Sequence, residues 1–153
     1  MISFVHTRYL FFYLLCLLGS STFAQSFLPA GSIVYPFRAS PAIVQTGTQF
    51  HVLYNNKAEH TIDSIVLKGP YSRVRLQIDS ISKGRFEYDS YTTMYTNNKI
   101  WVTVPKGRPE DMYDLMVYAA GEVSISRRSV KLVREFSTRH SFIHITDTHV
   151  SRN

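Results

Sequence analysis

Residues 73–78 read RVRLQI, so apolar and polar side chains alternate strictly. Successive side chains of a β-strand point to opposite faces, and strict alternation is typical of a strand with one buried and one solvated face. The two arginines of this stretch then belong to the solvated face. Residues 48–54, TQFHVLY, follow the same rule and place Phe50, Val52 and Tyr54 on one face. Both stretches predict half-buried strands.

Comparable runs recur through residues 27–135, separated by turn signals and without a long helical stripe. Segments of this kind at this spacing are typical of an all-β protein. Three polar segments predict turns, namely residues 55–57 (NNK), 68–70 (KGP) and 97–98 (NN). Asparagine, glycine and proline favour turns because they tolerate or impose the backbone angles that turns require.

Trp101 and His51 occupy polar positions of alternating runs. Trp101 lies between Ile100 and Val102, and His51 lies between Phe50 and Val52. We expect His51 to be a surface residue. For Trp101 we expect core or partly buried packing, because tryptophan contributes a large apolar area when buried. A surface binding platform is the alternative for this residue.

The loop at residues 105–110, PKGRPE, leads into Tyr113-Asp114-Leu115. A proline-bearing acidic loop before Tyr-Asp-Leu resembles the start of a late strand in immunoglobulin-like modules, where the tyrosine ties the corner. We expect about seven or eight strands, and that number fits an immunoglobulin- or fibronectin-like β-sandwich. The sequence therefore predicts an all-β sandwich over residues 25–136.

Residues 1–24 predict a secretory signal peptide. Arg8 provides the positive start, residues 9–19 are almost wholly apolar, and Thr22-Phe23-Ala24 offers a cleavage site. The apolar run is shorter than the roughly 20 residues that span a bilayer. We therefore expect cleavage after about Ala24, a secreted or periplasmic protein, and no stable membrane anchor afterwards.

The single cysteine, Cys16, lies inside this predicted signal peptide. Cleavage would leave a protein without disulfides or thiolate metal sites, so its stability would depend on an apolar core. The composition permits such a core, since 44% of residues are hydrophobic and 18% are charged. The formal net charge of +6 comes from basic residues scattered along the chain. Nucleic-acid binding requires basic residues gathered on one face, so we do not expect it.

Residues 137–153 differ from the preceding part. After a polar linker, Phe142 to Thr146 form a run rich in β-formers that leads directly into Asp147 and His149. Side chains two residues apart in an extended chain point to the same side, with Cα atoms about 7 Å apart. A carboxylate and an imidazole placed in this way can bind one cation, and mixed oxygen and nitrogen ligation suits Zn²⁺, Mn²⁺ or iron.

Residues 143–149, IHITDTH, resemble the first signature block of the calcineurin-like metallophosphoesterases, a hydrophobic strand ending in Asp-x-His. In that family the pattern continues with Gly-Asp, Gly-Asn-His-Asp/Glu and Gly-His-x-His blocks, none of which occurs here. The resemblance implies that residues 137–153 are a linker and the first strand of a truncated α/β catalytic domain. A surface turn after an edge strand is the alternative.

The resemblance also implies a function. Asp147 and His149 would be metal ligands in a dinuclear centre of the Mn, Fe or Zn type, and the substrate of the intact enzyme would be a phosphoester. We expect this chain, as the N-terminal fragment of such a secreted hydrolase, to be inactive alone because most of the active site is missing.

A secreted β-sandwich binding module without enzymatic activity is the second interpretation. Its ligand would be a polysaccharide or a protein partner. Four aromatic residues, Tyr88, Tyr91, Tyr95 and Trp101, are the candidates for a face that stacks on sugars.

Overall fold

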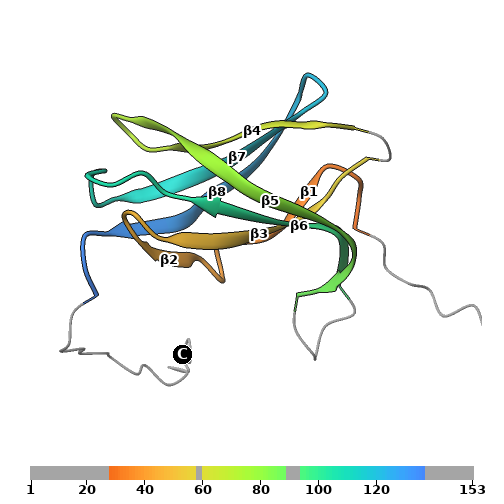
Figure 1. Cartoon of the computed structure of the whole chain (residues 1–153), viewed down its shortest axis with the longest axis horizontal. Coiled ribbons are helices and arrows are strands. Elements are labelled where there is room, and N and C mark those ends of the chain that lie inside the picture. Colours follow the sequence, from red (N-terminus) through yellow and green to blue (C-terminus); the bar gives the residue numbers. More distant parts are fainter. Residues whose placement is uncertain (1–27, 58–59, 89–93, 137–153) are drawn as a thin grey trace, which may run out of the picture.

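Figure 1 shows the computed structural model of the chain, which describes residues 28–57, 60–88 and 94–136. Eight strands and no helix occur in these ranges. In chain order they are β1 (Ser32–Tyr35), β2 (Ala42–Gln45), β3 (Gln49–Asn55), β4 (Ile62–Lys68), β5 (Arg73–Glu87), β6 (Tyr95–Thr103), β7 (Met112–Ala119) and β8 (Glu122–Val133). The all-β prediction is therefore confirmed, and the eight strands agree with the seven or eight expected.

The strands form one hydrogen-bonded order, β1-β3-β6-β5-β4-β7-β8-β2. Every neighbouring pair is antiparallel except β2 and β8, which are parallel. At the ends of this order β2 approaches β3 and β1 approaches β8, so the sheet nearly closes into a barrel. The Tyr54 and Ser124 hydroxyl oxygens lie 3.3 Å apart and join β3 to β8.

β5 is the strand that connects the two halves of this arrangement. Its first residues, Arg73 to Leu76, pair with β4, and residues Gln77 to Glu87 pair with β6. In Figure 1 it runs diagonally from the side of β4 to the side of β6. Two register shifts, at Ile78/Ser80 and Lys83/Phe86, interrupt its pairing with β6. Such bulges increase the local twist and bend a strand, which allows β5 to serve both halves.

The core lies between the two halves and uses the alternating positions that the sequence marks. Phe50, Val52 and Tyr54 of β3 are all buried, and so are Ile100 and Val102 of β6. Full burial of an aliphatic side chain of this size contributes about 1.5–3 kcal/mol to the hydrophobic stabilisation. The expected partition of these strands into inner and outer faces is therefore correct.

Tyr113 is the largest fully buried side chain and lies near the start of β7. Its hydroxyl donates a hydrogen bond to the carbonyl oxygen of Pro109, 3.0 Å away, and lies 3.3 Å from the Ser72 hydroxyl. A buried phenol needs a partner for its O–H, and the carbonyl provides one. The bond ties the β6–β7 loop to the core, as the Tyr-Asp-Leu sequence predicts.

A bulge in β8 is fixed by polar contacts. Arg128 has a φ of 49°, a conformation that costs energy in a residue with a side chain, and its N–H donates to Asp114 Oδ1 at 2.8 Å. The buried Ser126 hydroxyl donates to the carbonyl oxygen of Pro36 at 2.8 Å. Together these bonds hold β8 against β7 and against the segment between β1 and β2.

Of the three predicted turns, one is confirmed and one is wrong. At residues 55–57 the structure shows that β3 ends at Asn55, and residues 58–59 lie outside the described ranges. After Lys68, the Gly69 N–H donates to the Ser72 carbonyl oxygen at 2.8 Å and closes the turn between β4 and β5. The turn predicted at residues 97–98 is wrong, because both asparagines lie inside β6.

Candidate functional site

The outer face of β3 and β6 is the surface opposite the core. Its side chains occupy every second position of the two strands, and the register pairs His51 with Trp101 and Leu53 with Lys99. Leu53 is only 3% exposed although it lies on this outer face. A solvated sheet face normally carries polar residues, so a buried leucine on it shows that neighbouring side chains cover this region.

Five rings form a connected set on this side of the sheet, which we term the aromatic row: Phe37, Tyr88, Tyr35, His51 and Trp101. Ring centroids are 5.4 Å apart for Phe37 and Tyr88, and 6.0 Å apart for Tyr88 and Tyr35. Tyr35 stacks on His51 at 5.0 Å, and His51 lies 5.4 Å from Trp101. These separations suit favourable aromatic pairs.

Two cations lie over aromatic rings of the same face. The Lys99 Nζ is 5.3 Å from the ring centroid of Trp101, and the Arg85 Cζ is 3.6 Å from that of Tyr95. Both distances fall within the range in which the ring quadrupole attracts a cation. Each contact therefore restricts a long basic side chain to a position over the face.

A cavity of about 350 Å³ opens beside the aromatic row. It is lined by His51, Leu53, Arg85, Phe86, Glu87 and Lys99. Burial, and then the nearby Lys99 ammonium, lower the pKa of His51 below its ordinary value. Both causes disfavour the imidazolium, so His51 is neutral around pH 7 and has one nitrogen that donates and one that accepts.

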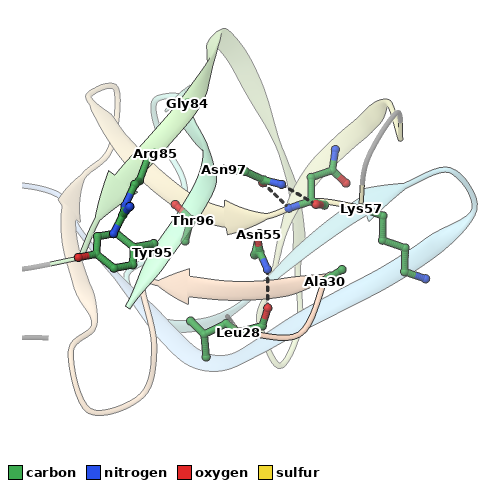
Figure 2. Close-up of a pocket in the computed structure, with 10 residues that line it drawn as sticks. Leu28, Ala30, Asn55, Lys57, Gly84, Arg85, Tyr95, Thr96 and Asn97 are labelled. Atoms are coloured by element: carbon green, nitrogen blue, oxygen red, sulfur yellow. Dashed lines mark hydrogen bonds between the residues drawn. The ribbon is translucent and has the colours of Figure 1, made fainter. Parts of the chain in front are cut away.

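A second cavity, of about 530 Å³, lies further along the sheet toward the start of β6 (Figure 2). Figure 2 shows Arg85 and Tyr95 on one side, Ala30 and Lys57 on the other, and Leu28 below. The other lining residues are Asn55, Asn56, Gly84, Thr96 and Asn97. Arg85 lines both cavities, so the two are neighbours along one surface.

Asparagine side chains fix the wall of the second cavity. Asn97 Oδ1 accepts from the Asn56 N–H at 2.8 Å, and Asn97 Nδ2 donates to the Asn56 carbonyl oxygen at 2.8 Å. Asn55 Nδ2 donates to the carbonyl oxygen of Leu28 at 2.6 Å. Asn98 is 4% exposed and its Nδ2 donates to Asn97 Oδ1 at 2.6 Å. These bonds explain why residues 97–98 remain in a strand instead of forming a turn.

At the other end of the outer face, the Asp79 carboxylate accepts three hydrogen bonds. Its Oδ2 accepts from Thr103 at 2.7 Å and from Gln49 at 3.1 Å, and its Oδ1 accepts from Gln77 at 3.1 Å. The three donors come from β6, β3 and β5, so this carboxylate links three strands. The outer face is thus bounded by fixed polar groups at both ends.

The predicted metal ligands, Asp147 and His149, lie outside the residues that the structure describes, as does the whole of residues 137–153. Tyr91 and the predicted signal peptide also lie outside them. Within residues 28–57, 60–88 and 94–136, no cluster of three or more His, Cys, Asp or Glu side chains is placed to hold a metal ion. No helix in these ranges is long and apolar enough to cross a membrane.

Trp101 corrects one expectation. It lies outside the core and is 36% exposed, so the core packing expected for it is wrong, while partial burial is right. The alternation with buried Ile100 and Val102 overrides the general tendency of tryptophan to enter a core. Among the other aromatic candidates, Tyr88 belongs to the aromatic row and Tyr95 lies under Arg85. Tyr35, Phe37 and the two cations were not predicted as parts of this surface.

No protein-family model, no curated protein and no solved structure matches this chain.

Proposed function

We propose that the described β-domain is the immunoglobulin-like accessory domain of a secreted calcineurin-like metallophosphoesterase, and that Asp147 and His149 belong to its metal centre. The observation that carries this function is the Asp-x-His motif of residues 143–149, which follows the end of β8 at Val133. A hydrophobic strand before this triplet is the family's first signature block.

Two features support the immunoglobulin-like assignment. The runs β1-β3-β6-β5 and β4-β7-β8 within the strand order correspond to the four-stranded and three-stranded sheets of constant-type immunoglobulin domains. The hydrogen bond from Tyr113 to Pro109 corresponds to the tyrosine corner of such domains. β5 lies at the end of the first run and also pairs with β4 of the second, and this double pairing joins the two runs into the single, nearly closed sheet.

The metal chemistry follows from the donor set. One carboxylate and one imidazole fit Mn²⁺, iron or Zn²⁺, and further ligands would come from the later blocks of the catalytic domain. A dinuclear centre of this type supplies an activated hydroxide and neutralises charge on the phosphoryl oxygens. The role of Asp147 and His149 would be to hold the metal from the end of their strand.

Reading the coding DNA beyond the codon of Asn153 is the first test. We expect Gly-Asp and Gly-Asn-His-Asp/Glu blocks there, and their absence over several hundred bases in every frame would refute the phosphoesterase function. The extended protein should then hydrolyse bis-nitrophenyl phosphate with Mn²⁺. Asp147→Ala and His149→Ala should abolish turnover, whereas Asp63→Ala, an exposed carboxylate on β4, should not change it.

The 153-residue chain alone should not hydrolyse the same substrate. Two ligands bind a metal weakly and leave a second metal without a site. Clear turnover by this chain that is lost in Asp147→Ala would contradict that expectation.

A binding module is the second candidate function. It is favoured by the aromatic row and its two cations, which occupy a sheet face that a purely structural domain would cover with simple polar residues. This function is compatible with an accessory role, because a phosphoesterase can carry a domain that binds a ligand.

A further inference from the structure

The two cavities form one extended surface along β6. Trp101 and Tyr95 both lie on the outer face and are six residues apart, which corresponds to about 20 Å of extended strand. Between them lie Lys99 and the Arg85 side chain that lines both cavities. We term the two cavities, together with Trp101 beside His51 of the first cavity, the outer groove. It is longer than a single sugar ring or amino acid, so its shape fits a linear ligand.

We propose, on the basis of the binding-module candidate, that the outer groove binds a linear oligosaccharide that carries carboxylates. Such a chain presents three kinds of groups: apolar faces of sugar rings, many hydroxyls, and negative charges at intervals. The outer groove offers a counterpart for each of them.

An aromatic ring of the outer groove would stack on the apolar faces of the sugar rings. Trp101 is 36% exposed, and its ring lies near the His51 ring and the Lys99 ammonium. Aromatic side chains provide a large amphipathic contact area, and a ring that is already fixed loses little entropy when it binds. Tyr95, at the far end of the groove, is half-buried with Arg85 over its ring, so its role is to hold the guanidinium in place.

Basic side chains of the outer groove would form ion pairs with the carboxylates of the ligand. Arg85 presents a planar guanidinium that can bind a carboxylate with two parallel hydrogen bonds, and its stacking on Tyr95 fixes its orientation beforehand. Lys99 provides a second positive charge about midway along the groove. The spacing of the two cations along the surface suits a ligand whose charges are also spaced.

Acidic and neutral polar groups select hydroxyls. Glu87 lines the first cavity beside Arg85 and Lys99, and Asp79 lies at the end of the same outer face. A carboxylate accepts hydrogen bonds from hydroxyls, and each ring of an acidic sugar chain carries several hydroxyls whereas a nucleotide unit within a nucleic acid carries at most one. A nucleic acid therefore fits this surface less well than an acidic sugar chain.

Trp101 makes the test direct, because it is the only tryptophan of the chain. Its fluorescence should change saturably when the full chain is titrated with hexasaccharides of polygalacturonate or alginate. The neutral cellulose and xylan hexasaccharides should bind at least 10-fold more weakly, because they lack the carboxylates. Affinity for the acidic hexasaccharides should fall as the salt concentration is raised.

Variants locate the site. Calorimetric titration should show an affinity at least 10-fold lower for Trp101→Ala than for the wild type. The decrease should be smaller for Trp101→Phe. Arg85→Gln and Lys99→Gln should remove the preference for acidic over neutral chains. Tyr71→Ala is the matched control, since Tyr71 is 99% exposed in the β4–β5 turn, away from the groove, and its loss should leave binding unchanged. The unfolding midpoint of each variant shows that it is folded.

The outcomes separate this inference from the functions on which it depends. Equal affinity for neutral and acidic chains, with loss in Trp101→Ala, would overturn the acidic ligand while retaining the binding module. Failure of every hexasaccharide to bind, or full binding by Trp101→Ala, would overturn the sugar site altogether. The phosphoesterase function is tested separately, by hydrolysis of bis-nitrophenyl phosphate by the extended protein.

Discussion

The Tyr113 hydroxyl donates to the carbonyl oxygen of Pro109, 3.0 Å away, from a side chain that is completely buried. Pro109 itself is exposed, in the loop that joins β6 to β7. The bond thus holds a surface loop against the core through a buried phenol. Tyr113 also lies 3.3 Å, oxygen to oxygen, from Ser72, in the turn that joins β4 to β5. One side chain therefore ties two loops together.

Tyr113→Phe removes this bond and keeps the ring. We expect the free energy of unfolding to fall by about 1 kcal/mol, the usual net contribution of an intramolecular hydrogen bond. Urea unfolding should show a lower midpoint with an unchanged slope. The control is Tyr118→Phe, because Tyr118 is half-buried and its hydroxyl meets the Met116 sulfur at 3.9 Å. An equal loss in both variants would contradict a special role for Tyr113.

Gly69 is the second residue that Tyr113 constrains. A Cβ at position 69 would lie 2.7 Å from Cε1 of the Tyr113 ring, closer than real contacts allow. The ring is buried and cannot move aside, so Gly69→Ala should destabilise the domain by about 1–3 kcal/mol, as overpacking does. Urea unfolding measures the loss. In a Tyr113→Leu background the same substitution should cost less, and an identical cost in both backgrounds would show that the clash is not its cause.

The β7–β8 hairpin carries a residue that does not suit its turn. Ala120 has a φ of 48° and Gly121 a φ of 81°, and they form the two-residue connection between paired Ala119 and Glu122. Positive φ values at both central positions are typical of a type I′ turn, which favours Asn-Gly. Ala120→Asn should therefore raise the free energy of unfolding by about 0.5–1 kcal/mol. Ala120→Val, which disfavours positive φ more strongly, should lower the thermal midpoint instead; the same direction for both would refute this explanation.

The inner faces of the strands could be predicted because they depend on local alternation. Ile100 and Val102 are buried as their positions indicate, and so are Phe50 and Val52. The full length of β5 could not be predicted in this way. Its two register shifts break the alternation, and its change of partner from β4 to β6 depends on contacts between residues distant in the sequence.

Only part of the outer groove could be predicted from the sequence. Trp101 and His51 occupy positions that alternation assigns to the outer face. This signal predicts the surface position of His51, and it could have identified Trp101 as a surface ring as well. Their association with Tyr35 depends on the pairing of β1 with β3 and of β3 with β6, which no local pattern specifies. The turn predicted at residues 97–98 was wrong for a related reason. Asn97 forms its hydrogen bonds with Asn56, which is distant in the sequence.

His51 should make the stability of the domain depend on pH. Burial and the Lys99 ammonium hold its pKa in the folded state below the ordinary value of 6.5. The unfolded chain then binds more protons than the folded chain between these two values, so stability rises with pH across that window. The free energy of unfolding should fall as the pH is lowered from 7 through 6.5 and should stop responding to His51 below the folded pKa.

His51→Gln removes this titration and should flatten the dependence in the same pH window, as measured by urea unfolding at several pH values. Protonation of His51 would also place a third positive charge beside Arg85 and Lys99 in the first cavity. The affinity of the outer groove for an acidic hexasaccharide should therefore increase when the pH is lowered. The increase should be smaller in His51→Gln than in the wild type. Both measurements are made above the pH range in which the sugar carboxylates are protonated. A wild-type slope of stability in His51→Gln would show that other groups cause the pH dependence.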